Sequence, residues 1–184
     1  MTAQSSLLLP LAGFLAEASG SIRRFDLETT IPLDDAFVLG GPIRAGFEIS
    51  RTNRGIFIEG DVSTVLAMDC SRCLVPVSVI LATRIREEIL PSIDQATGQA
   101  VDRTAEPDVA RLTAHHELDI EILLREAIAL SAPIAPLCGP DCLGLCIECG
   151  ERLSGDHRDH ATDDIDPRLA ALRRFQVDAG GENE

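Results

Sequence analysis

The stretches that decide the fold are IFIEGDVSTVLAM at residues 56–68 and LVPVSVILATRIREEI at residues 74–89. In both, residues of one kind recur at every second position; Glu59 and Asp61, for example, alternate with Ile58 and Val62. A period of two places alternate side chains on opposite faces of a strand. We therefore predict two antiparallel strands with at least one half-buried face.

Further strands precede this pair. Residues 43–49 show strand composition, and the Asn and Gly of the segment 51–55 suit the positive φ of a tight hairpin turn. One more strand is expected at about 24–30, so that a strand meander covers about residues 22–90. The predicted architecture is an antiparallel meander or a partly open barrel.

The second half of the chain predicts a covering helix and a cysteine-rich segment. Residues 92–116 lack a period and are expected to form an acidic flexible insertion. A helix at about 118–130 carries an apolar stripe that is expected to cover the sheet: Ile120, Leu123, Leu124, Ala127 and Ile128. A knuckle segment at 136–160 and a helix at about 165–175 follow. We predict one α+β domain over residues 1–184.

The composition limits the partners. All 16 basic residues are Arg, and the formal net charge is -14 with a pI near 4.6. An acidic surface repels phosphate, so broad nucleic-acid binding and a DNA partner are not expected. Five arginines are either a small basic face for RNA or members of surface salt bridges: Arg51, Arg54, Arg72, Arg84 and Arg86.

The N-terminal stretch 7–18 resembles the apolar part of a signal peptide but has no basic segment before it, and Pro10 interrupts its apolar run. No window approaches the roughly 20 apolar residues that span a bilayer. We therefore expect a cytoplasmic protein without a membrane partner. In that reducing compartment six cysteines are better explained by metal ligation than by disulfides.

The cysteines have the spacing of zinc ligands. Two C-x-x-C pairs supply a first predicted site: Cys70, Cys73, Cys146 and Cys149. A possible second site has two cysteines and two histidines: Cys138, Cys142, His157 and His160. Other partitions, such as one site made of the four cysteines from 138 to 149, stay open. All-sulfur sites are closed to water, so one or two structural zinc ions are predicted as the cofactor.

Two other kinds of function require features that this sequence largely lacks. A thiol redox protein would place its first Cys at a helix N-terminus, whereas Cys70 follows a strand and Cys73 precedes another. A zinc hydrolase or nuclease would need an open metal position and a general base, for which only the segment 157–160 qualifies. We therefore predict no enzymatic activity and no catalytic residue.

The order of several motifs resembles the YceD-like family of large-subunit ribosomal RNA accumulation proteins. The matching segments run through the chain: residues 20–25, Cys70 to Leu74, residues 118–120, residues 136–138, Cys142 to Cys146, Cys149-Gly150 and residues 165–172. Where many relatives carry two more cysteines, this chain has His157 and His160.

The resemblance implies a noncatalytic factor in ribosome biogenesis that supports the accumulation and processing of large-subunit rRNA. Expected partners are ribosomal proteins, a pre-ribosomal particle or assembly factors, with indirect contact to rRNA. A basic ribosomal protein would complement the acidic surface. The alternatives are a zinc-stabilised protein-interaction module and a thiol redox sensor, both unrelated to rRNA.

Overall fold

The computed structural model describes residues 7–33, 37–102, 104, 106–153, 157 and 168. The chain forms two compact units, Met1–Cys142 and Leu143–Glu184, and each is described by itself. The predicted C-terminal helix at about 165–175 lies outside the described residues, apart from residue 168. The prediction that the whole chain is one domain stays a prediction.

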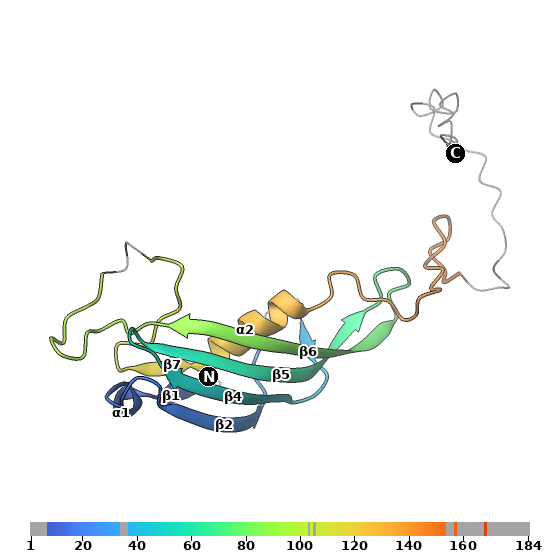
Figure 1. Ribbon diagram of the computed structural model, residues 1–184. Helices are drawn as coiled ribbons and strands as arrows, with labels where there is room; N and C mark the ends of the chain where they lie inside the picture. Colours follow the sequence, from blue (N-terminus) through green and yellow to red (C-terminus); the bar gives the residue numbers. More distant parts are fainter. Residues whose placement is uncertain are drawn as a thin grey trace, which may run out of the picture. The chain divides into compact units, whose positions relative to one another are not determined.

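The first unit is mostly antiparallel sheet with two helices (Figure 1). Its elements are β1 (Leu8–Pro10), α1 (Ala12–Leu15), β2 (Ile22–Thr29), β3 (Val38–Leu39), β4 (Ile43–Arg51), β5 (Ile56–Asp69), β6 (Pro76–Ile89), β7 (Glu117–Asp119) and α2 (Ile120–Ser131). β2, β4, β5 and β6 pair in sequence order, as the meander prediction requires. β3 pairs with the far end of β5, and β1 pairs with β7 in a small second sheet.

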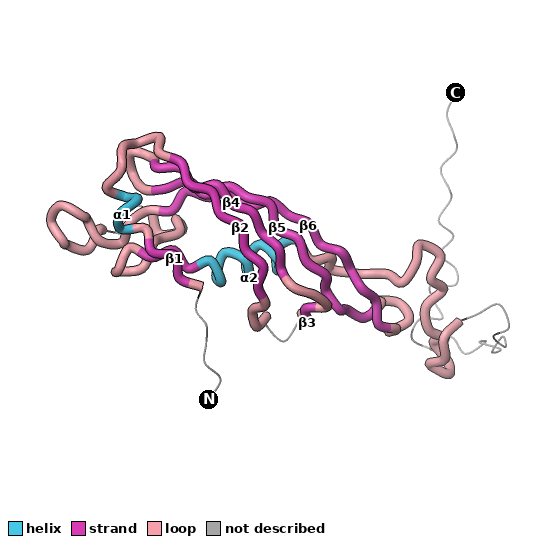
Figure 2. Tube along the Cα trace, turned by 90° about the horizontal axis from the view of Figure 1, so that it is seen from below, coloured by secondary structure: helices cyan, strands magenta, loops and turns pink. Residues whose placement is uncertain are grey.

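Of the two predicted architectures, a meander or a partly open barrel, the sheet takes the form of a meander and does not close into a barrel. Among the described strands, β2 and β6 are the two edges of an open sheet, and no pairing joins them. The core is closed instead by α2, which packs against β6 on one face of the sheet (Figure 2). α2 and the N-terminal residues Leu11, Phe14 and Leu15 contribute to one core with the sheet, so the sheet does not need to curl into a barrel to form it.

The helix prediction is confirmed with small shifts of its ends. The Asp119 side chain accepts a hydrogen bond from the Ile122 amide at 3.2 Å and caps the helix. Of the predicted stripe, the buried residues are Ile120, Leu123, Leu124 and Ile128. None of the described helices has the length and apolar content that crossing a membrane would require.

The N-terminal stretch has a structural role that the sequence analysis missed. Leu11, Phe14 and Leu15 are buried in the core, and β1 beside them pairs with β7. Three-residue strands and a four-residue helix leave too short a pattern for periodicity to reveal. The apolar run that resembles a signal segment is therefore core of the first unit.

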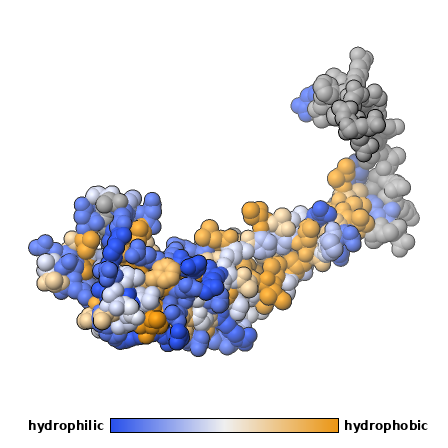
Figure 3. Space-filling view, viewed as in Figure 1, coloured by the Kyte–Doolittle hydropathy of each residue, from blue (hydrophilic) through white to orange (hydrophobic). Residues whose placement is uncertain are grey.

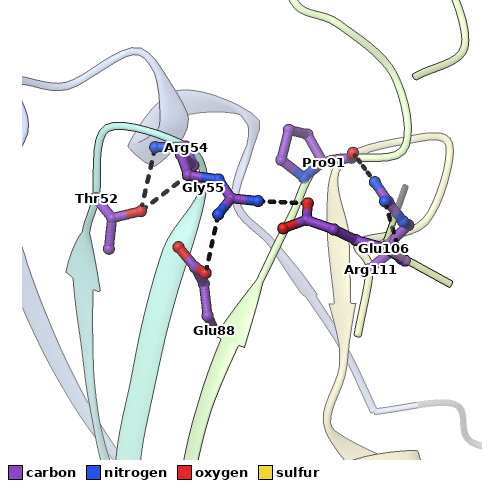
Figure 4. Close-up of polar contacts among 7 residues, drawn as sticks. All are labelled: Thr52, Arg54, Gly55, Glu88, Pro91, Glu106 and Arg111. Atoms are coloured by element: carbon purple, nitrogen blue, oxygen red, sulfur yellow. Dashed lines mark hydrogen bonds and ion pairs between the residues drawn. The ribbon is translucent and has the colours of Figure 1, made fainter. Parts of the chain in front are cut away.

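The acidic insertion is anchored at several points. It forms no helix or strand in its described part. However, the Leu90 amide donates to the Ala110 carbonyl oxygen, the Leu112 amide donates to the Leu90 carbonyl oxygen, and Leu112 is buried. Arg54 in the β4–β5 turn forms ion pairs with Glu88 and Glu106, so it ties this turn to the insertion (Figure 4). These contacts attach the insertion to the rest of the first unit, which its composition did not indicate. Its flexibility stays a prediction.

Candidate metal centres

The sulfur atoms of Cys70, Cys73, Cys138 and Cys142 form one cluster in the first unit, with all four within 4.8 Å of one another. The Cys70 sulfur lies 3.8 Å from that of Cys142, and the Cys73 sulfur lies 3.6 Å from that of Cys138. Zinc–sulfur bonds of about 2.3 Å require about 3.8 Å between neighbouring vertices of a tetrahedron. The four thiols therefore fit one tetrahedral metal ion.

The first two ligands lie on the loop that joins β5 to β6. The Cys70 amide donates to the Val75 carbonyl oxygen at 2.8 Å, and the Leu74 amide donates to the Cys70 carbonyl oxygen at 2.9 Å. Leu74 has φ of 56°, a region that non-glycine residues rarely adopt. These contacts fold C-x-x-C into a tight turn that holds both sulfurs on one side, and both cysteines are buried.

The other two ligands reach this turn from the end of α2. The Ser71 amide donates to the Pro136 carbonyl oxygen at 2.8 Å, and the Arg72 guanidinium donates to the Cys142 carbonyl oxygen at 3.0 Å. Protein hydrogen bonds thus already position residues 136–142 against the β5–β6 loop. A metal ion would complete this attachment.

The thiols influence one another's ionisation. Burial alone would raise the pKa of the Cys70 thiol, but backbone amide hydrogen bonds, including those from Arg72 and Cys73, lower it to about 6. Hydrogen bonds with the Cys142 and Cys73 sulfurs raise the pKa of Cys138 to about 12. Without a cation, these hydrogen bonds favour the thiolate at Cys70 and the neutral thiol at Cys138. A divalent metal ion would instead stabilise all four thiolates.

A second cluster lies in the second unit, where the donor atoms of Cys146, Cys149 and His157 come within 4.8 Å of one another. The His157 Nε2 atom lies 3.3 Å from the Cys149 sulfur. The Cys146 sulfur accepts a hydrogen bond from the Glu148 amide at 3.4 Å, and amide hydrogen bonds, first that from Cys149, lower the pKa of Cys146. Sulfur and imidazole donors in this arrangement suit zinc.

Both C-x-x-C segments fold in the same way. In the second, the Gly150 amide donates to the Cys146 carbonyl oxygen at 2.9 Å, and the Cys146 amide donates to the Glu151 carbonyl oxygen at 2.7 Å. These are the offsets found in the first turn, and Gly150, with φ of 72°, occupies the position of Leu74. Glycine favours such a left-handed backbone, whereas leucine gives no sign of it, so the role of Leu74 was not predicted.

The structure groups the predicted ligands differently from the predicted partition. Cys70 and Cys73 lie with Cys138 and Cys142, and His157 lies with Cys146 and Cys149; His160 lies outside the described residues. Two features of the sequence were available to indicate that Cys138 and Cys142 act as a pair of ligands. They are the C-x₃-C spacing of this pair and its position just after α2. The clusters could hold a metal ion, whereas its identity and the final ligand set stay predictions.

The arginines that sequence analysis placed in a possible RNA-binding face all have partners within the first unit. Arg84 and Arg86 form ion pairs with Glu59, and Arg54 pairs with Glu88 and Glu106. Arg51 donates to backbone oxygens, including that of Leu15 at 3.0 Å. The ion pairs of Arg54, Arg84 and Arg86 support the salt-bridge interpretation for these three arginines.

Comparisons with known proteins identify the family. An uncharacterized protein of Mycobacterium tuberculosis is 31% identical over 133 residues, which cover 72% of this chain and 61% of that protein. An uncharacterized protein of Mycobacterium leprae is 28% identical over 136 residues, covering 72% of this chain and 58% of that protein. The match thus spans about three fifths of the length of these relatives.

A maize protein named large ribosomal RNA subunit accumulation protein YCED homolog 1, chloroplastic, is 27% identical over 135 residues, covering 61% of this chain and 46% of the maize protein. No solved structure matches the chain. Residues 58–176 match the family described as large ribosomal RNA subunit accumulation protein YceD, and this range includes every cysteine. The chain therefore belongs to the YceD family.

Proposed function

We propose that this chain is a noncatalytic ribosome-biogenesis factor that supports the accumulation and processing of large-subunit ribosomal RNA in the cytoplasm, with a structural zinc ion held by Cys70, Cys73, Cys138 and Cys142. Family membership supports the ribosome-related role. The observation that carries the zinc assignment is the fit of the four sulfurs to one tetrahedron.

The donor set favours a structural metal over a catalytic one. Four protein sulfurs fill a tetrahedral coordination sphere, so no position is left for a water molecule that the metal could activate. Two of the four ligands are buried in the β5–β6 turn, and the other two come from the segment after α2. The ion would therefore join the ends of two elements that are distant in sequence.

The proposed partners are ribosomal proteins, a pre-ribosomal particle or assembly factors, and contact with rRNA is proposed to be indirect. The formal charge of -14 disfavours approach to a polyanion. The described arginines of the suspected RNA face are engaged in ion pairs or backbone hydrogen bonds. Basic ribosomal proteins are electrostatically favourable partners for the same surface.

The function is tested by removing the gene and measuring the ratio of 23S to 16S rRNA, together with the level of precursor 23S rRNA. The ratio should fall and return with the native chain expressed from a plasmid. A variant with Cys70→Ser and Cys138→Ser should restore it less well at equal protein level. A ratio that does not change on deletion would contradict the proposal.

The short distances between the thiols also favour a second candidate function, redox sensing. An oxidation experiment distinguishes a redox sensor from a structural zinc site. Mild peroxide treatment of a redox sensor would join neighbouring sulfurs and expel the metal ion. A structural site should keep its zinc under the same treatment. The measurement is zinc release with a colorimetric chelator, combined with mass spectrometry of the cysteines.

A further inference from the structure

The solvent-facing side of the large sheet, opposite α2, changes its chemistry along the strands. At one end a row across β2, β4, β5 and β6 contains Ile22, Ser50, Phe57 and Glu88. The next three rows carry most of the charges: Arg24, Glu48, Glu59 and Arg86; then Asp26, Gly46, Asp61 and Arg84; then Glu28, Arg44, Ser63 and Ala82. Beyond these rows Val65 lies opposite Ile80, and Val38 of β3 lies opposite Ala67. We call the surface formed by Val38, Val65, Ala67 and Ile80 the apolar rows.

The apolar rows are open to solvent. Ile80 is 83% exposed and Val38 is 62% exposed, although both are large β-branched residues. Residues 62–83 contain only two charged side chains, Asp69 and Arg72, in a chain with 46 acidic and basic residues. Figure 3 shows apolar residues gathering along the distal part of the β5–β6 pair, while hydrophilic residues dominate the other end of the first unit. An apolar surface of this kind in an acidic protein indicates a contact with another protein.

Carboxylates lie on the same face of the sheet, and the row that contains Ser63 separates Asp61 from Val65 of the apolar rows. The side chain of Asp61 is 85% exposed, and its nearest arginine nitrogen, on Arg84, is 4.0 Å away and belongs to a residue that also pairs with Glu59. The Asp26 carboxylate lies over the bare backbone of Gly46, where a Cβ atom would come within 2.8 Å of its oxygen. Asp26 and Asp61 line one shallow hollow around Gly46. Arg44 lines it too but pairs with Glu28 of the same hollow, so the net charge of the lining is negative.

Charge decides which occupant fits. The four arginines of the charged rows each form an ion pair with a carboxylate of the same face, so the face offers no excess positive charge to RNA. A second copy of the chain would bring a further formal charge of -14 against the first. A protein with apolar side chains flanked by Lys or Arg would satisfy both the apolar rows and the carboxylates.

We propose that the apolar rows, together with the carboxylates Asp26 and Asp61 on the same face of the sheet, form the docking surface for a basic protein. Ile80 and Val38 contact its apolar side chains, and the two carboxylates bind its Lys or Arg side chains. The surface follows from the fold alone; only the expectation that the basic protein is ribosomal rests on the proposed function.

Photocrosslinking in cells tests the surface. Benzoylphenylalanine is introduced in the full chain at position 80, at position 38 and, as a control, at position 130, where Leu130 is 88% exposed on α2. Mass spectrometry should identify the same basic protein crosslinked to positions 80 and 38. No adduct of that protein should form at position 130. Adducts to a second copy of the chain, to RNA or within the chain itself would overturn the proposal. The same adducts at all three positions, or no adducts at all, would also overturn it.

Binding of the identified partner, purified and titrated against the full chain, supplies the second measurement. Ile80→Thr should weaken binding by about tenfold or more, as expected when a central apolar contact is lost. Asp61→Asn should weaken it by about threefold and reduce its salt dependence. Leu130→Gln, with a similar loss of exposed apolar surface, should leave the dissociation constant unchanged; equal effects of Ile80→Thr and Leu130→Gln would overturn the assignment.

The two proposals fail in different ways. A basic partner that is not ribosomal, together with an unchanged 23S to 16S ratio on deletion, would leave the docking surface in place and remove the proposed function. A fall of that ratio without any adduct at positions 80 and 38 would remove the surface alone.

Discussion

A pair of double variants tests how the cysteines are divided between metal ions. In the observed grouping, Cys70→Ser with Cys142→Ser removes two ligands from one cluster, whereas Cys70→Ser with Cys146→Ser removes one ligand from each. We expect the native chain to hold about two zinc ions, the first double variant about one and the second about none. If the ligands were grouped as the sequence predicts, the first double variant would hold about no zinc and the second about one zinc ion.

The size of the effect follows from the ligands removed. Losing a group that only orients a metal ligand already costs about 10–100-fold in affinity. Losing a ligand itself should cost more, and Cys70 is fully buried, so water is poorly placed to replace it. Zinc should therefore leave a damaged cluster during a brief exposure to a chelator that leaves the intact cluster loaded.

Elemental analysis and native mass spectrometry of proteins purified without chelator supply the counts. Cobalt substitution adds the donor type, because charge-transfer absorption grows with the number of thiolates and separates a four-sulfur site from one with two sulfurs and an imidazole. Two ions retained by the variant with Cys70→Ser and Cys142→Ser would refute the reasoning. A single zinc ion, lost with Cys142→Ser and kept with Cys146→Ser, would confine the metal to the first cluster.

Three further predictions concern the sheet. Gly60→Ala should destabilise the fold by about 1–3 kcal/mol in denaturant titrations, because the new methyl group would overlap the ring of Phe47. Gly13→Ala, with open space around it, should not destabilise the fold. Equal stabilities of the two variants would contradict this reasoning. Burial raises the pKa of Glu87, and its Oε2 atom has no hydrogen-bond partner in the described part of the chain, so ionisation is penalised in the folded state. Glu87→Gln should therefore raise the melting temperature at pH 7, and the gain should vanish at low pH where both states are protonated; a gain independent of pH would exclude this cause. Arg84→Ala should leave association with RNA in pull-downs unchanged, since Glu59 already neutralises this arginine, and a clear loss would restore the RNA-binding face.

The strands and the covering helix were predictable because their signals are local. Alternation at Ile58, Glu59 and Asp61 marks β5, and the capped apolar stripe from Ile120 marks α2. What this pattern leaves open is whether the edges of the sheet join. The sheet stays open, with α2 packed against β6. The sequence of neither segment alone predicts this contact.

The candidate site was predictable in its composition and less so in its arrangement. Spacing identifies Cys70, Cys73, Cys146 and Cys149 as pairs, since a C-x-x-C turn brings its own two sulfurs together. Which pairs meet depends on the path of the chain after α2, which brings Cys138 and Cys142 to the β5–β6 turn. The left-handed residue Leu74, which shapes that turn, carries no signal in its side chain.

The sequence by itself determined the strand meander, the capped helix, the thiol ligands and the family, because each rests on residues close together in the chain or on their order along it. Only the tertiary structure decided that Cys70 lies 3.8 Å from Cys142, and that Ile80 and Val38 share one exposed surface on the same face of the sheet as Asp61. Such distances join residues separated by tens of positions, and they depend on the register and packing of whole elements, which a local pattern does not contain.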